Sequence, residues 1–422
     1  MGAKIYLILI LGLFGFLFIL NKKKPKEYLF WSSMCLLFIR PLNIPGLGEI
    51  NLPFLLLMIV FVSDLSNALT IKNFKGWRLY LFMLFVGFVT MLLNANELEG
   101  LSPNEIIQRS LLWIQNFAVV FIIGILISAF VKTKADLIKL EKIFLWNCFL
   151  FSITAIMAFL GFYDGVIIFG PGSFTGNTIQ DYSRDIIFSE IYGISYSNLV
   201  FGVTTLSIVF LPTLKWSYLK KNIYLALIIF AVIISLKRLA IVSLIVVLLY
   251  YLIREKQKGR NTWLLVIPFL IFILGTTYYD LILKRFDGVL SSIDGTGVRD
   301  SSSDIRLDRI YLAIDAFAEQ PLIGKGAGFL GYVHNGLFEV LGNLGLLGLL
   351  LFRPFFKLIF KKKFSFFFHN PWAISVFVFM FTLLLFESAV NRIEIMYFLG
   401  LLSGGAIAYN RLFSEHESKF TL

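Results

Sequence analysis

Four cations in an otherwise apolar sequence have the residue types and spacing to bind a large anion. Lys237 and Arg238 form a basic pair between two apolar runs. Arg306 and Arg309 are three residues apart, so they share one face of a helix. The planar guanidinium group of arginine forms bidentate hydrogen bonds with phosphate oxygens. These residues therefore indicate a site that could hold a diphosphate.

Both pairs of cations also have a structural explanation. Lys237 and Arg238 could extend their long side chains from a tight hairpin toward the membrane surface. The arginines near position 306 could pair with Asp304 and Asp308 on a solvated helix face. The sequence alone leaves both explanations open.

A candidate base follows the second pair of arginines. His334 opens a long apolar run, and a neutral imidazole there could accept a proton from an attacking hydroxyl. Asn335 could cap the helix or orient a sugar hydroxyl. Glu339 lies one turn further inside the apolar run, where a carboxylate needs a partner. It could pair with a cation or help to orient an acceptor, and a structural role is open for all three residues.

The sequence gives no pattern for a metal or a nucleotide cofactor. Zinc-ligand spacing and the Walker motif are absent from it. The glycines of residues 324–328 follow a helical pattern and Pro321, which is not the context of a phosphate-binding loop. Cys35 and Cys148 both lie in apolar runs, where cysteine packs as a small apolar residue. We therefore expect neither a metal nor another cofactor.

The elements that position these residues must be membrane helices. Hydrophobic residues make up 58% of the chain and charged residues 15%. This composition predicts an all-α polytopic membrane protein, a single integral membrane domain over residues 1–422, with about 12 to 13 transmembrane helices. The predicted spans lie near residues 4–20, 28–40, 52–67, 77–94, 108–131, 143–162, 189–212, 222–236, 239–253, 262–279, 333–352, 371–387 and 393–410.

The net charge of +12 comes largely from alternate connections between the spans. Clusters of Lys and Arg mark cytoplasmic connections, so the charge points to membrane topology and not to nucleic acid. The connections between them are poorer in basic residues, such as the acidic loop Asn94–Ser102. This alternation assigns residues 163–188 and 280–332 to loops on the non-cytoplasmic side, together with that acidic loop.

The larger of these loops has two distinct halves. In the first half, the run SSIDGTGVRDSSSD at residues 291–304 is rich in Ser, Gly and Asp, as in a mobile connection. The second half has apolar residues at helical spacing, at positions 310, 313, 314 and 317. We predict a short amphipathic helix there, capped by Asp304, ended before Pro321 and lying over the outer mouth of the bundle.

The same residues carry a resemblance to a known family. The run RLDRIYLAIDAFAEQPLIGKG begins at Arg306, and HNGLFEVLGNLGLLG begins at His334. In this order and spacing they resemble the signature of the O-antigen ligase and O-antigen polymerase superfamily. Arg238, in ISLKRLAIVSLI, is similar to an upstream Ser/Thr-x-x-Arg element of that family. The resemblance in motif covers residues 230–350.

The resemblance implies an inverting, metal-independent glycosyltransferase with a GT-C-like membrane fold. Its donor would be a glycan on undecaprenyl diphosphate at the periplasmic face of a bacterial inner membrane. Arg238 and Arg306 would hold the diphosphate, assisted by Lys237 and Arg309, and His334 would orient or deprotonate the acceptor hydroxyl. The expected partners are this lipid-linked oligosaccharide, membrane lipid and a protein that regulates chain length.

Two departures from the family pattern favour one branch of it. Ligases often carry a second His just before the His-Asn pair, but Gly331, Tyr332 and Val333 stand there. The acid usually close to the pair is displaced to Glu339. We therefore expect a polysaccharide polymerase, with a ligase acting on the lipid A core as the alternative. A transporter or flippase without chemistry is the alternative of another class, and it would carry its polar groups near the bilayer midplane.

Overall fold

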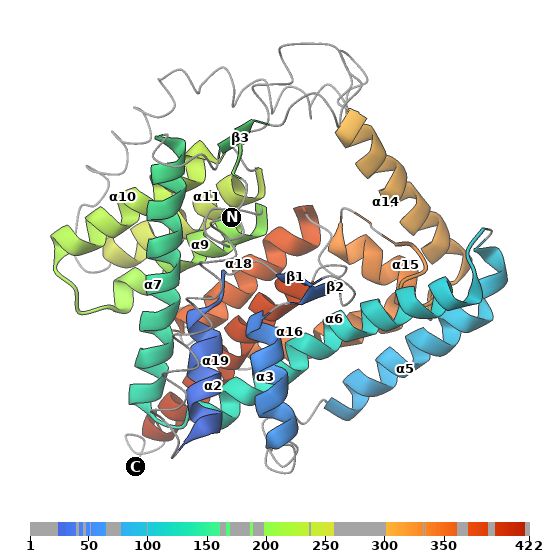
Figure 1. Ribbon diagram of the computed structural model, residues 1–422, viewed down its shortest axis with the longest axis horizontal. Helices are drawn as coiled ribbons and strands as arrows, with labels where there is room; N and C mark the ends of the chain where they lie inside the picture. The colour runs from blue at the N-terminus through green and yellow to red at the C-terminus, as the bar shows by residue number, and fades with distance from the viewer. Residues whose placement is uncertain are drawn as a thin grey trace. The chain divides into compact units, whose positions relative to one another are not determined.

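The computed structural model describes residues 24–38, 42–44, 48–50, 52–64, 77–98, 100–160, 166–168, 186–188, 198–235, 238–256, 301–331, 333, 335–360, 370–386 and 393–417. The described chain is helical apart from turns and two short hairpins (Figure 1). The α-helices are α2 (Pro25–Cys35), α3 (Leu52–Ser63), α5 (Trp77–Leu93), α6 (Pro103–Phe130), α7 (Lys134–Phe159), α9 (Asn198–Leu206), α10 (Tyr218–Ile234), α11 (Arg238–Lys256), α14 (Ser301–Glu319), α15 (Gly336–Gly348), α16 (Arg353–Phe360), α18 (Pro371–Phe386) and α19 (Ile393–Glu417).

Short 3-10 helices and antiparallel hairpins complete the described structure. The 3-10 helices are η2 (Ala95–Glu97), η4 (Ser207–Thr213) and η5 (Leu349–Phe352). The hairpins pair β1 (Leu42–Ile44) with β2 (Gly48–Ile50), and β3 (Val166–Ile168) with β4 (Ile186–Phe188). The second hairpin lies within the predicted loop 163–188, where the sequence did not lead us to expect strands.

The all-α polytopic membrane fold is confirmed. Every predicted span that falls on described residues coincides with a helix, whereas spans 4–20 and 262–279 lie outside the described residues. Within the described chain, three helices are long and apolar enough to cross a bilayer: Pro103–Phe130, Lys134–Met157 and Gly336–Leu358. The last of these joins α15, η5 and part of α16 into one segment.

The chain forms two compact units that alternate along the sequence. Unit 1 contains Met1–Ile71, Ile125–Lys258 and Ile407–Leu422, and unit 2 contains Lys72–Gly124 and Gly259–Ala406. Each unit has its own buried apolar side chains, such as Phe201 in unit 1 and Trp372 in unit 2. The prediction of a single integral membrane domain over 1–422 stays a prediction.

Aromatic stacking, a long-range hydrogen bond and helix packing hold the helices of unit 1 together. The rings of Phe30 and Phe130 stack with their centroids 4.7 Å apart. The hydroxyl of Tyr224 on α10 donates to the carbonyl oxygen of Leu145 on α7 across 3.1 Å. In this unit α9 packs against α11. The packing against α9 holds α11, the helix that begins at Arg238.

Two features of α14 differ from the prediction. The helix begins at Ser301 and has 19 residues, so Asp304 lies in its first turn and is not its N-cap. Residues 301–304, which we expected in a mobile connection, are therefore helical. A carboxylate is favourable throughout the first turn because of the helix dipole, so an acidic residue does not by itself mark the cap. The buried stripe consists of Ala313 and Ala316, whereas Ile314 is exposed. Small residues form this stripe because α15 packs closely against it, as described below.

Candidate active site

The segment that follows α14, residues 320–331, makes its main contacts through the backbone. The Lys325 amide donates to the Gly342 carbonyl oxygen across 2.9 Å, and the Gly326 amide donates to that of Asn343 across 2.8 Å. The Ala327 amide donates to the Gly87 carbonyl oxygen on α5, also across 2.8 Å. The segment is therefore held between α5 and α15.

This segment also completes a broken membrane helix. At Gly345 the backbone of α15 leaves the helical conformation, with φ 61° and ψ −158°, values that favour glycine. The Leu346 amide donates to the Pro321 carbonyl oxygen across 2.8 Å, and the Leu347 amide donates to that of Leu322 across 3.1 Å. Irregular backbone is tolerated at membrane depth where protein groups satisfy its hydrogen bonds. The residues before α15 supply those groups here.

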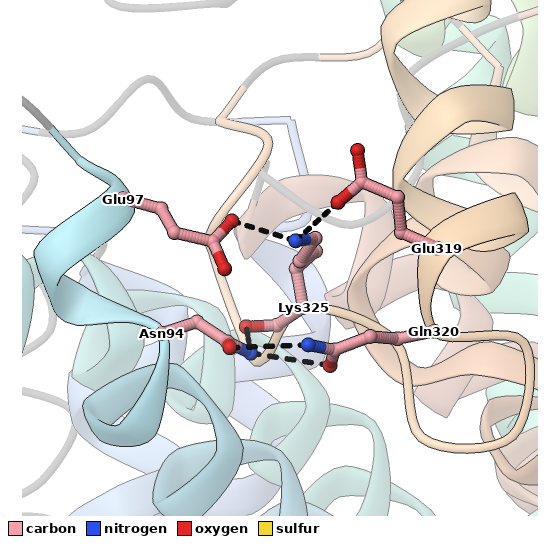
Figure 2. A network of polar contacts seen from close by, with 5 residues as sticks. All are labelled: Asn94, Glu97, Glu319, Gln320 and Lys325. Atoms are coloured by element: carbon pink, nitrogen blue, oxygen red, sulfur yellow. Dashed lines mark hydrogen bonds and ion pairs between the residues drawn. The ribbon is translucent and has the colours of Figure 1, made fainter.

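A buried lysine ties the same segment to the loop that follows α5 (Figure 2). Lys325 has only 6% of its side chain exposed, and its ammonium nitrogen lies 2.6 Å from a carboxylate oxygen of Glu97. It also pairs with Glu319, the last residue of α14. These bonds, with that to Glu319 the largest cause, raise the pKa of Lys325 above its ordinary value of 10.5. The lysine is therefore charged at neutral pH and joins three segments of unit 2.

An amide pair lies beside the lysine. The side chains of Asn94 and Gln320 exchange hydrogen bonds of 3.3 Å and 3.1 Å, and Asn94 also donates to the Lys325 carbonyl oxygen across 2.9 Å. Figure 2 shows both amides below the ion pairs. The charge alternation assigns the loop containing Asn94 and Glu97 to the same side of the membrane as residues 280–332, and these contacts agree with that assignment.

The helices α14 and α15 pack together (Figure 1), and the order of their contacts shows that they run in the same general direction. Ala313 lies against Gly342, because a Cβ added to this glycine would be 3.0 Å from the Ala313 carbonyl oxygen. Further along both chains, Pro321 lies beside Leu346. Residues later in α14 and just after it contact residues later in α15. The N-terminal ends of the two helices therefore lie at the same end of the helix pair.

These ends carry several of the predicted site residues. Arg309 is exposed one turn before Ala313, and Arg306 lies one turn earlier still on α14. On the other helix Asn335 is the N-cap of α15, and its side-chain oxygen accepts from the amides of Leu337 and Phe338, both across 3.1 Å. The capping role predicted for this residue is confirmed. A role in orienting a sugar hydroxyl stays a prediction.

The remaining predicted residues are distributed as follows. Glu339 is completely buried, one turn inside α15, as its place in an apolar run predicts. Arg238 is the first residue of α11 and belongs to unit 1, whereas α14 and α15 belong to unit 2. His334 and Lys237 lie outside the described residues, as do residues 280–300 of the large loop. The side chains of Arg306 and Arg238 are likewise not described, so the joint anion site stays a prediction.

Sequence reasoning missed the ion pairs of Lys325. The sequence did contain a hint of them. Glu97 lies in the short loop after α5 and Lys325 lies between two glycines, and charge alternation assigns both to one side of the membrane. Charges near a membrane surface are expected to pair, so these groups were candidates for one another. Across the described chain, no group of three His, Cys, Asp or Glu side chains could hold a metal ion.

A comparison with known proteins supports the family resemblance. Residues 223–353 match the family described as O-antigen ligase. The matched residues make up less than half of the chain. The matched part contains α11 with Arg238, α14, the segment around Lys325 and α15. No curated protein matches the chain. Residues 223–353 are therefore similar to the O-antigen ligase family, which agrees with the resemblance seen in the motifs of residues 230–350.

Proposed function

We propose that the protein is a membrane glycosyltransferase that polymerises a surface polysaccharide. Its donor is a glycan on undecaprenyl diphosphate, and its acceptor is a second lipid-linked repeat unit at the periplasmic face. The observation that carries the proposal is the common direction of α14 and α15 within the matched residues. It favours a site that combines the arginines of α14 with the residues at the start of α15.

The proposed step is a displacement at the anomeric carbon. The acceptor oxygen forms the new bond with inversion, and the bond to the diphosphate oxygen breaks. Arg306 and Arg238 stabilise the negative charge on the leaving diphosphate, and preorganised donors of this kind contribute roughly 10²–10³ in rate. His334 takes the proton of the acceptor hydroxyl, a contribution of roughly 10²–10⁴. No metal is required, because the arginines supply the positive charge.

The proposed site suits a lipid-linked substrate. The segment that joins α14 to α15 contacts α5 and α15, so the site would lie close to the bilayer. A polyprenyl chain could then remain among the lipids while its diphosphate reaches the arginines. Glu339 is buried beneath the N-cap of α15 and would help to hold the residues that face the acceptor.

The description of the matched family favours a second candidate, an O-antigen ligase. It would use the same donor and the same residues, but transfer the glycan to the lipid A core. The departures before His334 favour the polymerase. Both candidates place the enzyme in the bacterial inner membrane, and a chain-length regulator is the expected protein partner of the polymerase.

Purified protein in lipid nanodiscs distinguishes these functions. We would supply a lipid-linked single repeat unit with or without lipid A core, and resolve the products on a gel. A ladder of polymer from the repeat unit alone is the expected result. Transfer only to the core would identify a ligase. The same protein is also reconstituted into sealed vesicles, where movement of the donor across the bilayer without any new glycosidic bond would identify a flippase and overturn the proposal.

A further inference from the structure

Two exposed apolar side chains follow the C-terminal end of α14. Leu322 has 63% of its surface exposed and Ile323 has 40%. A single exposed leucine is common on soluble proteins and requires no explanation. These residues require one because their backbone neighbours belong to a membrane-spanning helix.

The neighbours place this part of the chain beside the middle of an apolar segment that is long enough to cross a bilayer. The Leu322 carbonyl oxygen accepts from the Leu347 amide, and that of Pro321 accepts from the Leu346 amide. Leu346 and Leu347 are exposed and lie in the middle of the 23-residue apolar segment Gly336–Leu358. Exposed apolar side chains in the middle of such a segment face lipid. Leu322 lies at the same level of the helix.

Several backbone groups of this stretch are satisfied within the protein. Pro321 has no amide hydrogen to satisfy. The Gly324 amide donates to the Gln320 carbonyl oxygen across 2.8 Å, and the carbonyl oxygens of Pro321 and Leu322 accept from α15. A non-helical segment can enter a bilayer only when such bonds are made within the protein.

A polar edge lies a few residues further along the segment. Lys325 is buried and paired with Glu97 and Glu319, which have 47% and 62% of their side chains exposed. The charge of the lysine is thus neutralised by its two partners, as expected for a charged group close to hydrocarbon.

We propose that residues 321–323 form a lipid-immersed apex that contacts the acyl chains of the bilayer. The hydropathy of residues 280–332 suggests that this part of the family signature lies in an extramembrane loop. In this proposal, part of it lies within the bilayer. It descends along α15 into the bilayer and returns to the N-cap of that helix. The proposal is independent of the transferase proposal, because its test involves no catalysis.

Site-directed spin labelling tests this placement. Cys35 and Cys148 are replaced by Ser and Ala, and a nitroxide is attached to a single new cysteine in the full chain in nanodiscs. The test variants are Leu322→Cys and Ile323→Cys. The lipid reference is Phe85→Cys, at a residue of α5 that is 63% exposed, and the water reference is Asp308→Cys, at an exposed residue of α14. Collisions with oxygen and with a water-soluble nickel complex report depth.

The labels at 322 and 323 are expected to match the label at 85, with high oxygen accessibility and low nickel accessibility. Nickel accessibility equal to that of the label at 308 would overturn the proposal. An immobilised label that neither reagent reaches would show a protein partner on this surface, and would overturn it too. Because two adjacent positions are tested, failure of one variant to fold leaves the other to decide.

Discussion

The backbone of Gly326 lies so close to the amide nitrogen of Met91 that no side chain fits between them. This approach is possible because glycine lacks a Cβ and because φ at this position is 113°, which other residues rarely adopt. Through this contact and the Ala327 amide, the segment between α14 and α15 is fixed against α5. Several of the expected effects of mutation depend on this packing.

Gly326→Ala is expected to destabilise the protein strongly. The left-handed backbone costs about 1–2 kcal/mol for a residue with a Cβ, and the overlap with Met91 adds about 1–3 kcal/mol. Gly100→Ala is the matched control, because its φ is 83° but no atom lies within 4 Å of the added Cβ. Thermal unfolding in detergent measures both variants, and equal unfolding temperatures would show that the Met91 contact is unimportant.

Removing the two carboxylates that pair with Lys325 should destabilise the protein more than removing the lysine itself. Replacing both Glu97 and Glu319 with Gln leaves a buried ammonium without its counter-charges, which costs about 3–5 kcal/mol. Lys325→Met removes the buried charge and leaves carboxylates that are already half exposed, so a cost of about 1 kcal/mol is expected. The double variant should therefore unfold at the lower temperature. The reverse order would mean that the lysine contributes mainly through its own packing.

Alkaline pH should weaken the same contact. The pKa of Lys325 is raised in the folded protein, so its stabilising contribution is fully present below the ordinary value of 10.5. This contribution is lost as pH rises through the higher, folded value. The difference in unfolding temperature between wild type and Lys325→Met should stay constant from neutral pH to about pH 10 and shrink above it. A constant difference across that upper range would contradict the assignment.

Asn335 has a confirmed capping role that substitutions can separate from a role in transfer. Asn335→Ala loses the acceptor for the Leu337 and Phe338 amides, at a cost of about 1 kcal/mol. Asn335→Asp keeps the cap and should keep the unfolding temperature. If the aspartate variant also keeps full transferase activity, the residue acts only as a cap. Loss of activity at unchanged stability would support contact with the acceptor.

The proposed site predicts graded losses of glycan transfer. Arg306→Ala and Arg238→Ala should reduce turnover by roughly 10²–10³ without loss of folded protein, because each removes a donor to the leaving group. Arg309→Ala should cost less, since this exposed residue has the assisting role. His334→Ala should reduce turnover by roughly 10²–10⁴. Wild-type rates in the Arg306 variant would exclude its role, and gel filtration of each variant checks folding.

Hydropathy and charge alternation predicted the helices and most of their boundaries, because both are local properties of the chain. The break in α15 could not be read in the same way. Gly345 is one of several glycines in that run, and only the neighbouring Pro321 and Leu322 carbonyl oxygens make the irregular backbone favourable there. The cap of α15 could be predicted, because Asn335 bonds to amides only two and three residues further along the chain.

Long-range pairing was the other limit. Glu97 and Lys325 are 228 positions apart, and nothing local to either residue identifies the partner. The assignment of both loops to one side of the membrane reduced the number of possible partners, but it did not identify the pair. The start of α14 was missed for a different reason: serines and Asp304 are compatible with a cap or with a first turn, and packing against α15 is not visible in the sequence.

The break in α15 also has a consequence for how the protein is made. The ribosome synthesises α5 first, then residues 321–326, and α15 last. When α15 leaves the translocon, the carbonyl oxygens that accept from Leu346 and Leu347 are therefore already present. A permuted gene that encodes α15 ahead of residues 321–326 would deliver the helix to the bilayer before its acceptors exist. The direction of translation thus suits the assembly of this helix.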